Sequence, residues 1–234
     1  MPNPNGGPSA IPITRNGLVF YLPLWRPDRT GTTFSSMPPN AALCTVTGAT
    51  WTSQGRSFIT DDKITCPTIP ALNSATNFTI TVWYMRSALA TSRVLWALGT
   101  TPNRLWAMTA AEVSQLYFYI SNGALSTGRF TQLDVVGTFY YFALVFDGAG
   151  ATNALKAKVY IGTVSSPMTQ QTVTFEDAAM PTSTADNSAS SFILGSTGTS
   201  QYLDGKEGEV LVYSSSLSLA QLEQNRKVTA WRYS

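Results

Sequence analysis

Two acidic residues near the end of the chain have a spacing that could support hydrolysis of a glycosidic bond. Glu207 and Glu209 lie two positions apart at a predicted strand, so we expect both carboxyl groups on one side of it, about 7 Å apart. Retaining glycosidases hold a nucleophile and a general acid about 5 Å apart. The plainer alternative is a solvated strand face beside a turn, and this is the one we expect.

The chain contains no histidine. This absence excludes histidine-based acid–base catalysis, Ser-His-Asp and Cys-His nucleophiles, and most zinc sites. Cys44 and Cys66 lie on separate predicted strands, and the sequence leaves open whether they form a disulfide or remain two buried thiols.

Calcium would require several loop oxygens, and the sequence predicts neither this metal nor a cofactor. The acid-bearing loops are Asp61-Asp62, Asp147 and Asp186-Asn187. A hairpin turn explains Asp147 more simply than a metal does, because Gly148 follows it.

Aromatic side chains offer a different chemistry, because their rings can pack on the apolar faces of sugars. Of the six tryptophans we expect most in the core. Trp83 shares a strand face with Thr79 and Thr81, and it lies either beneath a covering loop or on an exposed concave sheet. Trp106, beside Arg104, is the second candidate for a carbohydrate-binding surface.

The composition favours an exported or assembled protein. Charged residues make up 12% of the chain, about half the roughly 25% of ordinary soluble domains, so uncharged polar residues must form much of the surface. The net charge is +2 and the basic residues are scattered, so we expect no nucleic acid partner. No apolar run approaches about 18 residues, so we expect no membrane span.

Residues 1–16 are rich in proline and glycine and predict an extended arm. The arm is either a flexible leader or an assembly arm that docks on a neighbouring subunit through Pro2, Pro4, Pro8 and Pro12. No signal peptide is visible, because the first residues lack a basic and an apolar region.

From residue 17 to residue 234 we predict one domain built of short strands. Alternating patterns separated by turn residues predict an all-β, two-sheet antiparallel jelly-roll sandwich. Ser218, three residues before Gln221, has capping-box spacing and predicts one short C-terminal helix from Leu219. The predicted strands are Gly17–Leu24, Cys44–Trp51, Lys63–Cys66, Asn77–Arg86, Arg93–Leu98, Arg104–Met108, Ser114–Ile120, Gly128–Val135, Phe139–Phe146, Leu155–Ile161, Gln171–Phe175, Ser191–Leu194 and Glu209–Tyr213.

Several of these stretches, in order, resemble the laminin-G-like branch of the concanavalin A-like lectin/glucanase superfamily. They are Asn16–Leu24, Gly48–Trp51, Asn77–Trp83, Phe139–Gly148, Lys158–Gly162 and the closing strand and helix. The resemblance implies a two-sheet jelly roll, which lectins, adhesion modules, glucanases and viral surface proteins share.

The chain departs from the family pattern at positions that could carry chemistry. Tyr140 and Tyr141 stand where paired histidines are common, and Gly208 replaces an acid. The family's glucanases place a third acid on the strand, where this chain has Leu211 and Val212. We therefore expect no enzymatic activity and name no catalytic residue.

Three functions remain as expectations. The first is a non-enzymatic structural and binding protein on a particle surface, a virion (phage) decoration or attachment subunit, with other subunits, a second copy or surface glycans as partners. The alternative is a carbohydrate-binding lectin-like module of an exported bacterial protein that uses Trp83 or Trp106 with Arg104. The third is an unusual glycosidase. The expected location is a virion surface or the extracellular space.

Overall fold

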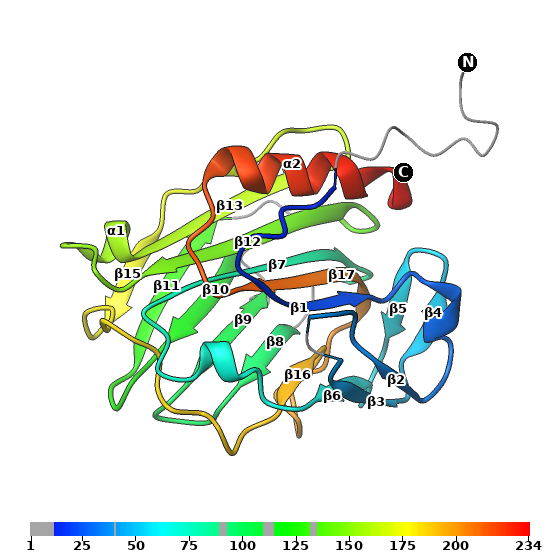
Figure 1. The fold of residues 1–234 in the computed structure, drawn as a ribbon, viewed down its shortest axis with the longest axis horizontal. Helices are drawn as coiled ribbons and strands as arrows, with labels where there is room; N and C mark the ends of the chain where they lie inside the picture. The colour runs from blue at the N-terminus through cyan, green and yellow to red at the C-terminus, as the bar shows by residue number, and fades with distance from the viewer. Residues whose placement is uncertain (1–11, 40, 89–92, 110–114, 132–134) are drawn as a thin grey trace.

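Two antiparallel β-sheets packed face to face form the protein (Figure 1). The structure is a computed structural model, and it describes residues 12–39, 41–88, 93–109, 115–131 and 135–234. The all-β, two-sheet architecture with a short C-terminal helix is confirmed, and the arrangement is that of a jelly-roll sandwich.

The first sheet has eight strands, and its centre is formed by the longest apolar strands of the chain. In spatial order they are β14 (Thr169–Gln170), β13 (Ala157–Thr163), β12 (Phe139–Asp147), β7 (Asn77–Arg86), β17 (Gly205–Tyr213), β5 (Gly55–Phe58) and β4 (Thr50–Thr52), with β1 (Leu18–Pro23) also paired to β17.

The second sheet has nine strands, most of them from the first half of the chain. In spatial order they are β15 (Thr174–Asp177), β11 (Ser126–Thr131), β10 (Gln115–Ile120), β9 (Leu105–Thr109), β8 (Arg93–Leu98), β16 (Phe192–Leu194), β6 (Lys63–Cys66), β3 (Leu43–Thr47) and β2 (Thr33–Ser35).

The main core lies between the two sheets and is made by the inward residues of the alternating strands. Phe142 of β12 contacts Trp96 of β8 and Phe130 of β11, with ring centres 5.2 and 6.3 Å away. Burying one such side chain contributes about 1.5–3 kcal/mol, so these aromatic contacts fix how the sheets stack.

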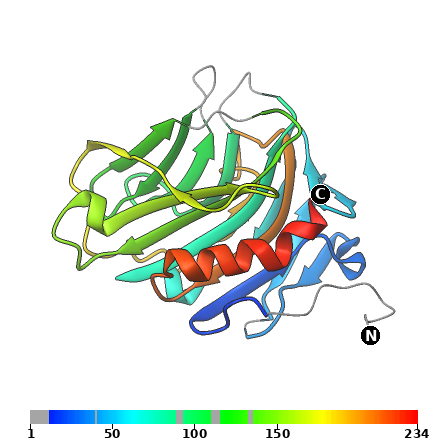
Figure 2. The same ribbon diagram turned by 90° about the horizontal axis from the view of Figure 1, so that it is seen from above.

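A second core lies on the outer face of the eight-stranded sheet, beneath helix α2 (Leu219–Thr229). Figure 2 shows α2 running alongside this sheet, with the strands of the other sheet beyond it. The capping box forms as predicted. The backbone N–H of Gln221 donates to Ser218 Oγ, and the backbone N–H of Ser218 donates to Gln221 Oε1. One helical face is buried, at positions spaced three or four apart, namely Leu222, Asn225, Arg226 and Thr229.

Some strand predictions were wrong in detail. The predicted strand Cys44–Trp51 is two strands in different sheets, β3 and β4, because Gly48 between them adopts a positive φ of 75°. The start of predicted strand Leu155–Ile161 is a short helix, α1 (Asn153–Lys156), capped by Thr152. Strands β2, β5 and β14 were missed because each is only two to four residues long.

Shorter 3₁₀ helices occupy connecting segments, namely η1 (Pro27–Arg29), η2 (Pro70–Leu72) and η3 (Ala230–Arg232). Two of them begin at proline, which favours the first turn of a helix because it lacks an N–H that would go unpaired there. Among the described residues, no helix is both long and apolar enough to cross a membrane.

Cys44 and Cys66 are joined in a disulfide that links β3 to β6. Both residues are buried, and their strands are hydrogen-bonded neighbours at Thr45 and Thr65. Of the two states that the sequence left open, the structure has the bonded one.

The proline-rich arm is described only from residue 12 onward. Gln224 Nε2 donates to the Pro12 carbonyl at 2.8 Å, and the Thr14 N–H donates to Asn225 Oδ1 at 2.7 Å. This end of the arm therefore lies against α2 of the same chain. Pro2, Pro4 and Pro8 lie outside the described residues, so docking of the arm on another subunit stays a prediction.

Candidate functional site

Glu207 and Glu209 are both fully buried, with 0% exposure. The expectation of a solvated strand face was wrong. A β-bulge between Glu207 and Val210 changes the pairing of β17 with β7. Glu207 stands opposite Tyr84, which belongs to the core between the sheets, whereas Glu209 meets side chains beneath α2. The two carboxyl groups therefore point to opposite faces and share no cleft.

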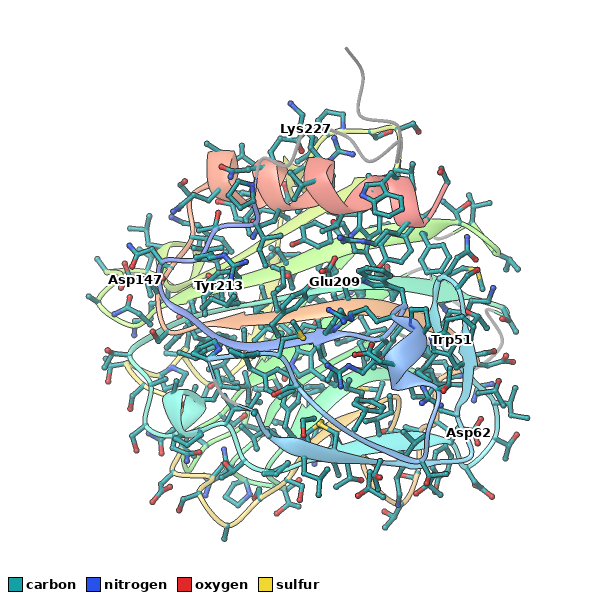
Figure 3. The ribbon with its side chains drawn as sticks, turned by 45° about the vertical axis from the view of Figure 1, so that its right-hand side comes forward. Trp51, Asp62, Asp147, Glu209, Tyr213 and Lys227 are labelled. Carbon is teal, nitrogen blue, oxygen red and sulfur yellow. A yellow bond between two sulfur atoms is a disulfide. The ribbon has the colours of Figure 1, made fainter. Side chains whose placement is uncertain are left out.

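Glu209 anchors the C-terminal end of the chain. Its carboxylate accepts a hydrogen bond from Arg232 Nη1 at 2.6 Å and another from the Tyr21 hydroxyl. Burial raises the pKa of the Glu209 carboxyl, and the Arg232 charge opposes that shift. Figure 3 shows Glu209 in the interior of the molecule, at the strand below α2. This arrangement has the features of a structural ion pair.

Glu207 lies in the core between the sheets and has no described hydrogen-bond partner for either carboxyl oxygen. Burial holds the pKa of this carboxyl well above its ordinary value. A carboxyl enclosed in this way has no contact with solvent in the described structure.

Gly208, which stands where the family has an acid, is required by packing. A Cβ at this position would lie 2.2 Å from Tyr233 Oη. The Tyr233 ring in turn stacks on Trp83, with centres 4.6 Å apart. Any side chain at residue 208 would therefore displace an aromatic ring of the second core.

Trp83 lies beneath α2 with no exposed surface. Its Nε1–H donates to Thr229 Oγ1 at 2.7 Å, and its ring packs on Tyr141 at 5.0 Å between centres. Of the two interpretations given for this residue, the covered one describes the structure, but the cover is helix α2 and not a loop. Its ring has no free face on which a sugar could stack.

Fewer tryptophans lie in the core than the sequence led us to expect. Trp83 and Trp96 are buried, Trp25, Trp51 and Trp106 are part exposed, and Trp231 is 52% exposed. Trp231 and Trp25 flank the Arg232 guanidinium, whose carbon lies 5.1 and 4.3 Å from their ring centres.

The outer face of the nine-stranded sheet carries an aromatic cluster, which we call the platform and define as Trp106, Tyr117 and Tyr119. Trp106 on β9 stands directly opposite Tyr119 on β10, and the ring centres are 6.1 Å apart. Tyr117 lies two residues from Tyr119 on the same face, and all three rings are part exposed. In Figure 1, strands β9, β10 and β11 lie side by side, on the sheet that α2 does not cover.

Local contacts hold the platform in position. The Trp106 Nε1–H donates to the Gly99 carbonyl at 3.0 Å. Arg104 places its guanidinium carbon 4.6 Å from the Trp106 ring centre and 5.6 Å from that of Tyr119, a cation–π geometry worth about 0.5–1 kcal/mol at exposed sites. The Arg104 Nη2 also donates to the Thr101 hydroxyl. The Trp106 and Tyr119 rings are therefore held by contacts within the protein itself.

Polar groups border the platform on the neighbouring strands. Tyr117 stands opposite Arg129 on β11, and Arg129 forms an ion pair with Glu176 on β15. Thr127 on β11 donates to Asp177 at 2.6 Å. Burial raises the pKa of the Tyr119 hydroxyl, so this group stays protonated and able to donate. The face combines flat apolar rings with hydrogen-bonding groups.

The sequence predictions found only part of this cluster. Trp106 and Arg104 were named and lie together, but Tyr117 and Tyr119 were missed. A signal existed, because both tyrosines alternate with Leu116, Phe118 and Ile120, which are all buried in the core.

The acid-bearing loops at Asp62 and Asp147 lie in separate parts of the structure (Figure 3). Among the described residues, no three His, Cys, Asp or Glu side chains are close enough to hold a metal ion together. Figure 3 shows Asp62 and Asp147 in widely separated places at the edge of the molecule. Asp62 Oδ2 accepts from the Ile59 N–H, and Asp147 Oδ1 accepts from the Ala149 N–H, so both carboxylates stabilise turns.

Comparison with protein families identifies a matching family. Residues 58–223, more than half of the chain, match the family described as the concanavalin A-like lectin/glucanases superfamily. No curated protein matches the sequence significantly.

Solved structures share the fold at low identity. Domain 4 of AbnA, an extracellular arabinanase from Geobacillus stearothermophilus in complex with arabinotriose, is 14% identical with a TM-score of 0.56, over 88% of this chain and 96% of that one. Trypanosoma rangeli sialidase is 14% identical with a TM-score of 0.60, and the match covers 92% of this chain and 33% of the sialidase. The binding domain of botulinum neurotoxin serotype G is 10% identical with a TM-score of 0.59, and the match covers 92% of this chain and 50% of the neurotoxin domain.

The chain thus spans about a third of the sialidase and half of the neurotoxin domain. At these identities the similarities show a shared fold.

Proposed function

The chain belongs to the concanavalin A-like lectin/glucanase superfamily, and from this premise we propose that it is a carbohydrate-binding module. We propose that the sugar binds on the outer face of the nine-stranded sheet, where the platform of Trp106, Tyr117 and Tyr119 lies beside Arg104. The observation that carries the proposal is the part-exposed Trp106 ring, fixed by its bond to Gly99 and by Arg104.

The chemistry of the platform suits a sugar. Aromatic rings pack on the apolar C–H faces of pyranose and furanose rings. The Arg104 guanidinium and the Tyr119 hydroxyl can donate hydrogen bonds to sugar hydroxyls. Because the rings are held in place beforehand, binding orders few side chains and therefore costs less conformational entropy.

Among the similar structures, the arabinanase domain was solved in complex with arabinotriose. That domain shares the fold over nearly its whole length, which supports the proposal of a sugar-binding role here. The disulfide between Cys44 and Cys66 supports an oxidising location such as the extracellular space, and we propose that location.

Two other functions have weaker support. A virion decoration or attachment role rests on the composition and on the arm, most of which lies outside the described residues, and none of the similar structures reported above is a virion protein. A glycosidase role through Glu207 and Glu209 has lost its geometric support, because both acids are enclosed and face opposite ways. A glycosidase role would require measurable hydrolysis of a glycosidic bond, and that activity would have to be lost in Glu209→Gln.

A glycan array tests the proposal. Labelled wild-type protein should bind at least one class of glycan in a saturable manner, and Trp106→Ala should lose that binding while keeping the wild-type circular dichroism spectrum. If Trp106→Ala binds as well as the wild type, the platform is not the glycan-binding site.

A further inference from the structure

The platform does not end at Tyr117, because a pocket opens directly beside it. This pocket has a volume of about 430 Å³ and lies between the end of β11 and the segment that crosses from β14 to β15. Its polar lining includes Gln115, Arg129, Gln170, Gln171, Thr172 and Thr174. Its volume falls within the range of about 300–1,000 Å³ that is usual for small-molecule sites.

The pocket and the platform form one continuous surface. Gln115, Tyr117 and Tyr119 alternate along β10 and therefore share a face, and Arg129 stands opposite Tyr117 on the next strand. The Tyr117 hydroxyl donates to Gln115 Oε1 at 2.9 Å. A platform residue is therefore hydrogen-bonded to a residue of the pocket wall.

We propose that this pocket is a second subsite, and that platform and pocket together bind a neutral oligosaccharide rather than a monosaccharide. The inference rests on the proposed function and specifies its ligand. Trp106 and Arg129 are two strands apart, about 10 Å at the usual strand spacing. One sugar ring cannot contact both, so a ligand that uses the whole surface has several linked sugar units.

The charges of the pocket favour a neutral sugar unit. Arg129, the cation of the lining, is already paired with Glu176, so its charge is largely compensated and offers little attraction to a carboxylate on the ligand. The other polar lining groups are amides and hydroxyls, which donate to and accept from sugar hydroxyls without a net charge. Arg104 lies at the opposite end of the surface, beside Trp106.

The test uses an array of linear oligosaccharides from one to six sugar units. The neutral series are arabinan, xylan, mannan and glucan, and the acidic series is polygalacturonate. Wild-type protein should bind one neutral series, with a signal that rises between the disaccharide and the tetrasaccharide. Binding that is strongest for the acidic series, or equal for monosaccharide and tetrasaccharide, would overturn the inference.

Variants separate the subsite from the platform. Thr172→Ala and Gln170→Ala should reduce tetrasaccharide binding at least fivefold while disaccharide binding changes less than twofold. Gln54→Ala, in the turn between β4 and β5, is the matched control and should change neither. One outcome would refute the subsite and leave the proposed function intact. In it, Trp106→Ala loses all glycan binding, but both pocket variants still bind longer oligosaccharides more strongly, as the wild type does. Absence of binding by the wild type to every glycan would refute both.

Discussion

Glu207 and Glu209 are two residues apart on β17, and the bulge between them turns their carboxyl groups to opposite faces of the eight-stranded sheet. Glu209 is paired with Arg232 beneath the C-terminal helix, whereas Glu207 lies in the main core without a described hydrogen-bond partner. The surroundings of these residues, rather than their spacing, decide what each of them does.

Stability should depend on pH through Glu207. Burial raises its folded-state pKa well above the ordinary 4.5, so the folded protein keeps a proton that the unfolded chain releases. This contribution to stability is fully present below about pH 4.5 and is lost as pH rises through the folded pKa, at up to about 1.4 kcal/mol per pH unit. Glu207→Gln should therefore gain free energy of unfolding over the wild type as the pH rises above about 5, as measured by urea denaturation.

Other groups titrate in both proteins, so the informative quantity is the difference between wild type and variant. A difference that stays constant over this pH range would show that Glu207 is not held in its neutral form.

Gly208→Ala should destabilise the protein, because the new methyl group would overlap the Tyr233 hydroxyl and move that ring off Trp83. Overpacking of this kind costs about 1–3 kcal/mol. Thermal denaturation checks the value. Gly31→Ala is the matched control, since its Cβ would meet nothing closer than 3.4 Å. Equal melting temperatures for the two variants would contradict the packing described for residue 208.

The Cys44–Cys66 disulfide closes a loop with a sequence separation of 22 residues. Loop-closure entropy predicts on the order of 3 kcal/mol of stabilisation. The double variant Cys44→Ala/Cys66→Ala should lose about that much free energy of unfolding, and reductant should destabilise the wild type but leave the variant unchanged. A wild type whose unfolding is insensitive to reductant, with all thiols reactive, would show that the bond does not form.

Much of the fold could be predicted from the sequence because the decisive signals are local. The alternation in Asn77–Arg86 and Phe139–Phe146 reproduces β7 and most of β12, and the Ser218–Gln221 capping box places the start of α2. The division of Cys44–Trp51 between two sheets could not be predicted, because it depends on which distant strands each half pairs with.

The candidate site was predictable only in part for the same reason. Spacing alone placed Glu207 and Glu209 on one face of the strand. The bulge that separates them appears only in the pairing of β17 with β7, a strand that is distant in sequence. Trp83 and Trp106 have similar strand patterns, and what distinguishes them is that α2 covers one sheet and not the other. No local pattern records which sheet a terminal helix covers.

The most direct test of the carbohydrate-binding platform is isothermal titration with the glycan that binds most strongly on the array. Wild-type protein and Trp231→Ala, whose exposed ring lies outside the platform, should bind it with the same dissociation constant. Trp106→Ala should bind more than tenfold more weakly, because truncation of an aromatic hot spot costs about 2 kcal/mol or more and 1.4 kcal/mol is about tenfold. Equal affinity of Trp106→Ala and wild type, or a loss confined to Trp231→Ala, would contradict the account.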